Sequence, residues 1–139
     1  MIGSVVFLKS FFCRFPVLLV TILALSACVS KPIYNVENRS FSSEAPLPIA
    51  TIKQKIKIIG ADRGWTFKDV APGHMIGRVG KAKHNARVNL YYTENSFSIK
   101  YLDSYNLKET GGNIHHRYNR WIEFLEQDLV IKLGLAAEK

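Results

Sequence analysis

The chain is poor in cysteine and has no long uninterrupted apolar run. Only Cys13 and Cys28 occur among its 139 residues, and these two do not provide the several disulfides that hold many small exported domains. A membrane-spanning helix needs about 20 apolar residues. Here Arg14 and Lys31 bracket a shorter stretch that contains Pro16. A hydrophobic core must therefore hold the fold.

Familiar catalytic and metal-binding motifs are also missing. The four histidines occur without a His-Glu-x-x-His or Cys-x-x-Cys pattern, and His115 and His116 are adjacent, so they point in different directions on a helix or strand. There is no Gly-x-Ser-x-Gly elbow. Gly77 and Gly80 lack the other residues of a phosphate-binding loop. We therefore predict no catalytic residue, no metal site and no cofactor.

The chain does have an N-terminal leader. A basic region ends at Arg14, and the uncharged stretch 15–25 has the length of a signal-peptide apolar region, about 7–15 residues. Leu25-Ser26-Ala27-Cys28 follows and resembles the lipobox of bacterial lipoproteins. The resemblance implies cleavage between Ala27 and Cys28 and a lipid on Cys28. An uncleaved anchor or an ordinary signal peptide is the alternative.

A lipid on Cys28 implies a membrane location. Each buried methylene contributes about 0.8 kcal/mol, so two or three acyl chains are needed for stable anchoring. The residue after the cysteine is Val29 rather than Asp, which resembles the pattern of Gram-negative lipoproteins that are sent on to the outer membrane. We therefore expect a lipid-anchored protein on the periplasmic face of the outer membrane rather than the inner membrane.

Acidic residues are few compared with basic ones. The chain has 19 Lys and Arg against 11 Asp and Glu, and loss of the leader with Lys9 and Arg14 leaves 17 against 11, a net charge of about +6. Such a surface favours an anionic neighbour. At an envelope location we expect contacts with an envelope protein or with anionic head groups, and not with nucleic acid.

Composition divides the chain into three parts. Residues 1–27 are the signal peptide, 28–47 form a lipidated tether rich in Ser, Pro, Asn and Glu, and 48–139 form the globular domain. The tether is richer in apolar residues than a spacer needs, so part of it is a candidate to dock onto the domain. These apolar residues are Ile33, Tyr34, Val36 and Phe41.

Helical periodicity appears twice. One helix starts near Pro48 and ends at Gly60 or Gly64, and a second follows Asn113 as N-cap and runs to about Leu133. The apolar face of the first contains Ile49, Ile52, Ile56 and Ile59. That of the second contains Tyr118, Trp121, Ile122, Leu125, Leu129 and Leu133. We expect Trp121, and likewise Trp65, in the core.

Between the helices, apolar and polar residues alternate as in antiparallel strands with one wetted face. The clearest runs are 86–92 and 97–102, separated by a hairpin turn at Glu94-Asn95. This order predicts the α+β class: a two-layer sandwich in which an antiparallel meander of three or four strands packs against an N-terminal and a C-terminal helix.

Aromatic and histidine side chains near basic residues are candidates for binding. They are Tyr91, Tyr101 and Tyr105 on strands and His115 and His116 at the start of the last helix. Sheets generally favour tyrosine, so a structural role is the alternative. A polar cluster bridges the same strand end and helix start and contains a serine, histidines and a carboxylate. Its residues, which also suit local hydrogen bonds to backbone, are Asp103, Ser104, Asn106, His115, His116 and Asn119.

Several short motifs along the domain form a set with a characteristic spacing. They are Gly64-Trp65, Pro72-Gly73, His84, Phe97-Ser98-Ile99-Lys100-Tyr101, Ser104-Tyr105-Asn106-Leu107, Ile114-His115 and Tyr118-Asn119-Arg120-Trp121. The set is similar to that of a family of small Gram-negative lipoproteins without an assigned biochemical role, over residues 36–133. The resemblance implies a compact α+β domain on a lipid anchor and supplies no catalytic residue.

We therefore expect a non-enzymatic module for interaction or assembly in the envelope. The alternative is a module that binds peptidoglycan, another glycan or a small ligand through exposed aromatic residues. An envelope hydrolase is the third hypothesis.

Overall fold

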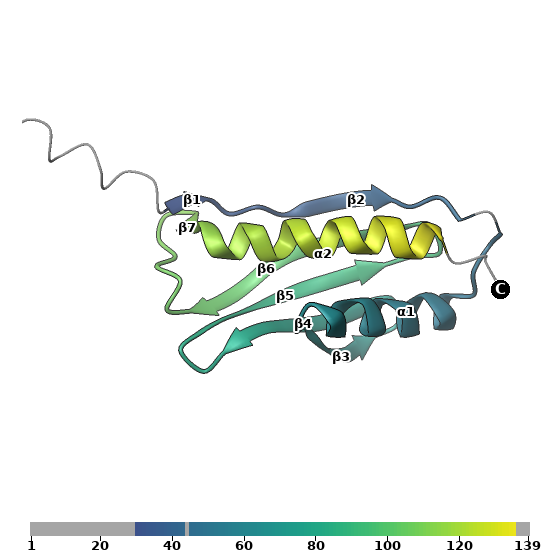
Figure 1. Cartoon of the computed structure of the whole chain (residues 1–139), viewed down its shortest axis with the longest axis horizontal. Helices are drawn as coiled ribbons and strands as arrows, with labels where there is room; N and C mark the ends of the chain where they lie inside the picture. Colours follow the sequence, from purple (N-terminus) through teal and green to yellow (C-terminus); the bar gives the residue numbers. More distant parts are fainter. Residues whose placement is uncertain (1–29, 44, 136–139) are drawn as a thin grey trace, which may run out of the picture.

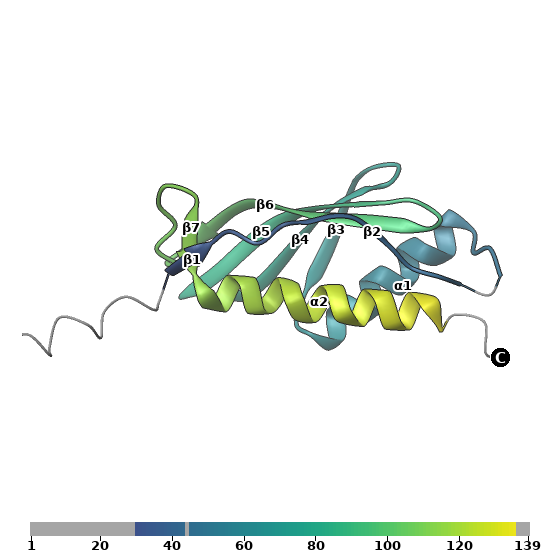
Figure 2. The same ribbon diagram turned by 90° about the horizontal axis from the view of Figure 1, so that it is seen from above.

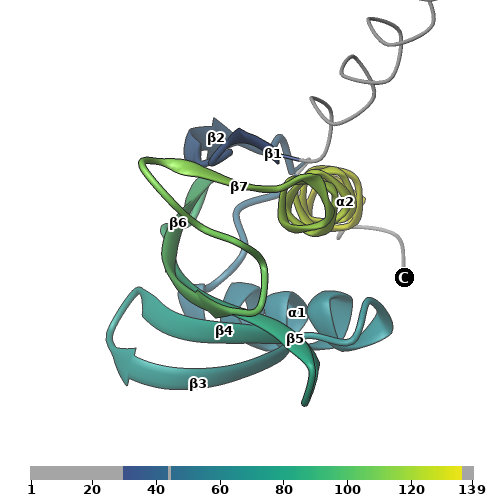
Figure 3. The same cartoon turned by 90° about the vertical axis from the view of Figure 1, so that its left-hand side faces the viewer.

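The computed structural model describes residues 30–43 and 45–135. Helices α1 (Ile49–Asp62) and α2 (His116–Gly134) lie on one side of a curved antiparallel sheet (Figures 1 and 3). The sheet has five strands in the order β2-β6-β5-β4-β3. These are β2 (Val36–Ser40), β3 (Thr66–Ala71), β4 (His74–Lys81), β5 (His84–Tyr92) and β6 (Ser96–Tyr105). A second, two-stranded sheet pairs β1 (Ser30–Pro32) with β7 (Asn113–His115).

The predicted α+β class is confirmed, and the two helices are placed as expected in the sequence. Strands β3 to β6 follow one another as an antiparallel meander. The five-stranded sheet has one strand more than the largest number predicted, because β2 pairs with the outer edge of β6. Strand β2 comes from the segment 28–47, which the composition assigns to a tether.

The N-terminal segment is fixed to the domain along its described length. Ser30 is the ladder partner of His115, and the side-chain amide of Asn119 bridges two backbone groups. Its Oδ1 accepts from the Tyr34 N–H at 3.0 Å, and its Nδ2 donates to the Pro32 carbonyl at 2.8 Å. The segment 30–43, which the composition assigns to a tether, is therefore paired with the domain from Ser30 onward.

Local pattern could not reveal strand β2. Only Val36 of its five residues is buried, and the register shifts between Val36 and Arg39, where Asn38 has φ of 46°. Such a bulge breaks the period-two alternation by which strands are recognised. Val36 and Phe41 are nevertheless buried in the core.

The core lies between the helices and the inner side of the sheet. Trp65 is 2% exposed, as expected. Ile49, at the start of α1, is exposed and so departs from the expected apolar face. The helix residues that the core does bury are Ile52, Ile56, Ile59, Tyr118, Ile122, Leu125, Leu129 and Leu133. No helix within 30–43 and 45–135 is long and apolar enough to cross a bilayer.

Tyr118 carries the one polar side-chain atom that is buried without a hydrogen bond in the described part of the chain. Its ring packs edge-on against Tyr101, with centroids 5.3 Å apart. Burial raises the pKa of the Tyr118 hydroxyl well above its ordinary value. An unpaired buried hydroxyl costs about 1–3 kcal/mol, which the packing of the ring must offset.

Candidate functional site: a cationic cleft beside helix α2

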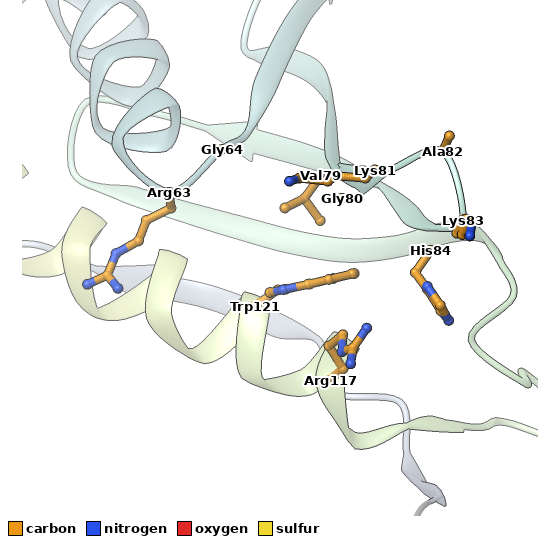
Figure 4. Close-up of a pocket in the computed structure, with 10 residues that line it drawn as sticks. All are labelled: Arg63, Gly64, Val79, Gly80, Lys81, Ala82, Lys83, His84, Arg117 and Trp121. Carbon is orange, nitrogen blue, oxygen red and sulfur yellow. The ribbon is translucent and has the colours of Figure 1, made fainter.

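A cleft of about 650 Å³ lies between the β4–β5 turn, the end of α1 and the first turns of α2 (Figure 4). We call it the cationic cleft. The residues that line it are Arg63, Gly64, Val79, Gly80, Lys81, Ala82, Lys83, His84, Arg117 and Trp121. None of these is a carboxylate.

The inner part of the cationic cleft is apolar. Val79 is buried, and the half-buried indole of Trp121 extends from α2 toward the side of the β4–β5 turn (Figure 4). The expectation that Trp121 belongs to the core is wrong. Trp121 lies next to the buried Ile122, at the edge of the apolar face of α2. One side of its ring therefore packs against the core, and the other side lines the cleft.

Positive charge surrounds this apolar part. Arg63 is compensated by Asp128, with Nε to Oδ2 at 2.7 Å and Nη2 to Oδ1 at 3.2 Å. The hydrogen bond and charge of Arg63 hold the pKa of Asp128 below its usual range. Within the described residues, no ion pair involves Lys81, Lys83 or Arg117. Three uncompensated cations beside an apolar surface suit an anionic group.

The β4–β5 turn is held in place by glycine and asparagine. Gly80 has φ of 99°, a conformation that side-chain-bearing residues rarely adopt. Asn106 Nδ2 donates to the Lys83 carbonyl at 3.0 Å and lies 3.3 Å from His84 Nε2. Asn106 therefore connects the end of β6 to the turn that carries the two lysines.

The start of α2 is capped by a histidine rather than by the predicted Asn113, which lies in β7. His115 Nδ1 accepts a hydrogen bond from the Arg117 N–H at 3.1 Å, and its ring stacks on His116 at 4.5 Å. The pKa of His115 is lowered, first by burial and then by its positive neighbours. These neighbours are His116, Arg117, Lys108 and His84. His115 thus has a structural role, and neither histidine lines the cleft.

The three candidate tyrosines do not form one surface. Tyr91 is 42% exposed and stacks on His74 at 4.4 Å, whereas Tyr101 is half-buried and its hydroxyl lies 2.9 Å from Ser104 Oγ. Tyr105 is 62% exposed and pairs with Asn85. Six positions separate Asn85 from Tyr91 on β5, a span of about 20 Å. None of the three tyrosines lines the cationic cleft.

The predicted polar cluster does not converge on one site. Asp103 accepts from Arg87, with Nε to Oδ1 at 2.8 Å, and this guanidinium lowers the pKa of Asp103. Ser104 pairs with the buried Ala86 and so points to the opposite face of β6. Asn119 is occupied in holding the N-terminal segment.

A second, smaller cleft of about 400 Å³ lies beside the start of α1 and the β3–β4 turn. Its lining contains a compensated pair, because Lys53 lies 3.4 Å from Asp69 Oδ2. Lys57 also pairs with this carboxylate, at 2.9 Å. No group of three potential metal ligands occurs in the part of the chain that the structure describes. The cationic cleft is therefore the better candidate for binding.

Sequence reasoning missed the cations of this cleft. A turn with two lysines, Gly80-Lys81-Ala82-Lys83, was the available signal. Its proximity to Arg117 and Trp121 depends on the packing of α2 against the sheet, which no local pattern encodes.

No family model, curated protein or solved structure matches this chain.

Proposed function

We propose that this chain is a lipoprotein anchored through Cys28 to the periplasmic face of the outer membrane. Its domain acts without catalysis as an interaction module, and the cationic cleft contacts an anionic component of the envelope. The observation that carries the proposal is the arrangement of Lys81, Lys83 and Arg117 around an apolar surface, without a carboxylate partner in the described chain.

Two effects favour binding of an anionic partner in the cationic cleft: the apolar wall removes water from the charges, and the concave shape concentrates their electric field. Most surface ion pairs contribute little, because water screens them. A concave site with one sign of charge and an apolar wall concentrates the field and attracts counter-charges. Arg63 does not share this role, since Asp128 already neutralises it.

A second candidate partner is an anionic glycan, which Trp121 favours. An indole presents a flat apolar face, and here it lies in a cleft lined by cations. The sheet tyrosines, on which the sequence-based hypothesis of glycan binding rests, lie outside this cleft.

Cys28→Ser is expected to abolish lipid attachment and to release the chain from the membrane, or to leave it uncleaved. Its thermal or urea unfolding is expected to match that of the unchanged domain, because residue 28 precedes the described fold. Growth with labelled palmitate followed by membrane fractionation measures both effects. Cys13→Ser is the matched control and should retain the label. Palmitate in the Cys28→Ser chain would refute the anchor.

A photocrosslinking residue in place of Ala82 is expected to form adducts in cells that depend on the surrounding charge. Ala82 is exposed between the two lysines of the turn. Replacement of Lys81, Lys83 and Arg117 by serine in the same chain should remove these adducts, because the partner is anionic. The same crosslinker at the exposed Tyr91 is the control. Adducts from Ala82 that persist after charge removal would contradict the cleft's role.

A further inference from the structure

Five exposed cations gather at the end of the domain where the N-terminal segment begins its pairing with β7. We name this surface the basic end and define it by Lys31, Lys81, Lys83, Lys108 and Arg117. We infer that the basic end docks on the phosphate head groups of anionic phospholipids in the membrane that holds the anchor. This inference rests on the proposed function and identifies the anionic partner of its cleft.

Pairings and hydrogen bonds bring the segments of the basic end together. Lys31 pairs with Ile114 in the two-stranded sheet, and the His115 N–H donates to the Leu107 carbonyl at 2.8 Å, next to Lys108. The β4–β5 turn reaches the same end through the bond from Asn106 to Lys83. Figure 1 shows β1, β7, this turn and the start of α2 at one end of the molecule, and Figure 2 shows β1, β7 and the start of α2 at the same end.

The charges of the basic end are uncompensated, unlike most others in the fold. The described residues include 16 lysines and arginines, since Lys9, Arg14 and Lys139 lie outside them. Seven of the 16 form ion pairs with carboxylates. Five of the remaining nine make up the basic end. The acidic residue of the adjoining β6–β7 loop is Glu109, so positive charge dominates this surface.

The geometry of the anchor brings this end, and not the opposite one, to the bilayer. Cys28 precedes Ser30 by two residues, and two extended residues span at most about 7 Å. From Ser30 onward the chain is fixed by pairing with β7 and by Asn119. A lipid on Cys28 therefore holds β1, which carries Lys31, within about one Debye length of the head groups, 8–10 Å at physiological salt, and turns the end of the domain that contains the other four cations toward the bilayer. Helix α2 leads away from this end for about 28 Å.

The cationic cleft gives the docking surface a concave centre. Lys81, Lys83 and Arg117 belong both to the basic end and to the lining of the cleft, where Trp121 adds an indole. Indole side chains favour the region of lipid head groups, because one part is apolar and the N–H is polar. A phospholipid head group would fit both parts of the cleft. Its phosphate would lie among the three cations, and its glycerol would contact the indole of Trp121.

Co-sedimentation with lipid vesicles tests the inference. Residues 28–139 carrying Cys28→Ser are used, so that neither the apolar leader nor acyl chains contribute to binding. This chain is expected to bind vesicles of phosphatidylglycerol and phosphatidylethanolamine at low salt, and not vesicles of phosphatidylcholine. Each cation removed is expected to lower partitioning about fivefold, the equivalent of about 1 kcal/mol. Lys81→Ser with Lys83→Ser should thus weaken binding roughly 25-fold.

A matched pair of substitutions separates position from net charge. Lys68 and Arg78 are exposed on β3 and β4 and form no ion pair in the described chain. Lys68→Ser with Arg78→Ser changes the net charge equally, yet should leave vesicle binding within about twofold, since these residues lie outside the basic end. Lys31→Ser with Lys108→Ser is the second test pair and should behave like the turn variant. Urea melts verify that all variants fold.

Three results would overturn the inference. They are absence of binding to anionic vesicles, equal losses from the Lys68/Arg78 control, and charge-dependent binding of soluble peptidoglycan fragments without vesicle binding. The last result would leave the proposed function intact and replace its lipid partner by a glycan. Failure of the proposed function itself is recognised separately, by palmitate labelling and by the Ala82 crosslink.

Discussion

Gly80→Ala is expected to lower the free energy of unfolding by about 3–5 kcal/mol. A side chain at φ of 99° costs about 1–3 kcal/mol by itself. In addition, the new Cβ would collide with the backbone carbonyl of His84 and would lie 2.8 Å from the Cα of Asn85. Backbone atoms of the paired strand cannot move aside as a flexible side chain can, so the turn must open. Urea denaturation of the two proteins measures the difference.

Gly64→Ala is the matched control for this prediction. Gly64 also has a positive φ, of 81°, but a Cβ there meets no atom within 4 Å. Its cost should therefore be limited to the conformational part, about 1–3 kcal/mol. If the two variants lost the same free energy of unfolding, the collision with His84 would have to be relieved by a backbone shift, and the larger loss predicted for Gly80→Ala would be wrong. An opened turn also displaces Lys81 and Lys83, so Gly80→Ala should weaken vesicle binding even where the protein remains folded.

Asn119→Ala is expected to lower the free energy of unfolding by about 2–3 kcal/mol. The side chain is 9% exposed and makes two hydrogen bonds to the N-terminal segment. Each such bond contributes about 0.5–1.5 kcal/mol, and a partly buried backbone group left without a partner adds a desolvation cost. The carbonyl of Pro32 and the N–H of Tyr34 are the groups affected. Urea melts measure the total loss of free energy of unfolding, and hydrogen exchange at the Tyr34 amide shows whether the N-terminal segment is the part that is loosened.

Asn119→Asp separates the two bonds. The carboxylate keeps an acceptor for the Tyr34 N–H, but it sets an oxygen against the Pro32 carbonyl and adds a charge at a position that is only 9% exposed, so at neutral pH we expect a loss of stability at least as large as that of alanine. In the folded proteins, exchange of the Tyr34 amide should nevertheless be faster in the alanine variant, which has no acceptor, than in the aspartate variant. Equal exchange in both would mean that Asn119 does not hold this segment. Release of residues 30–35 would lengthen the lipid tether by up to about 20 Å and so uncouple the basic end from the membrane.

Elements that local contacts build could be predicted from the sequence. The sequence predicts a helix that starts near Pro48 and ends at Gly60 or Gly64, and α1 runs from Ile49 to Asp62. Its residues Ile52, Ile56 and Ile59 are buried as their spacing indicates. The alternation of β5 is likewise confirmed, because a strand with one wetted face shows its period directly in the residues.

Elements that depend on distant partners could not be predicted. Strand β2 has a bulge and one buried residue, so its place in the sheet follows from the edge of β6 and not from its own pattern. Trp121 fits the helical stripe, yet lies where α2 faces the β4–β5 turn. The candidate site shows the same limit, since none of the five binding residues named from sequence lines the cleft.

The sequence by itself determined the class of fold, the two helices and most inward-facing residues, because these depend on periodicity over a few neighbouring positions. It also supplied the hypothesis of a lipid on Cys28, which lies outside the described residues. Only the tertiary structure decided that residue 30 is already fixed to the domain, and which unpaired cations share one surface. Lys31, the β4–β5 turn, Lys108 and Arg117 are distant in the chain, and their proximity arises from long-range pairing and packing.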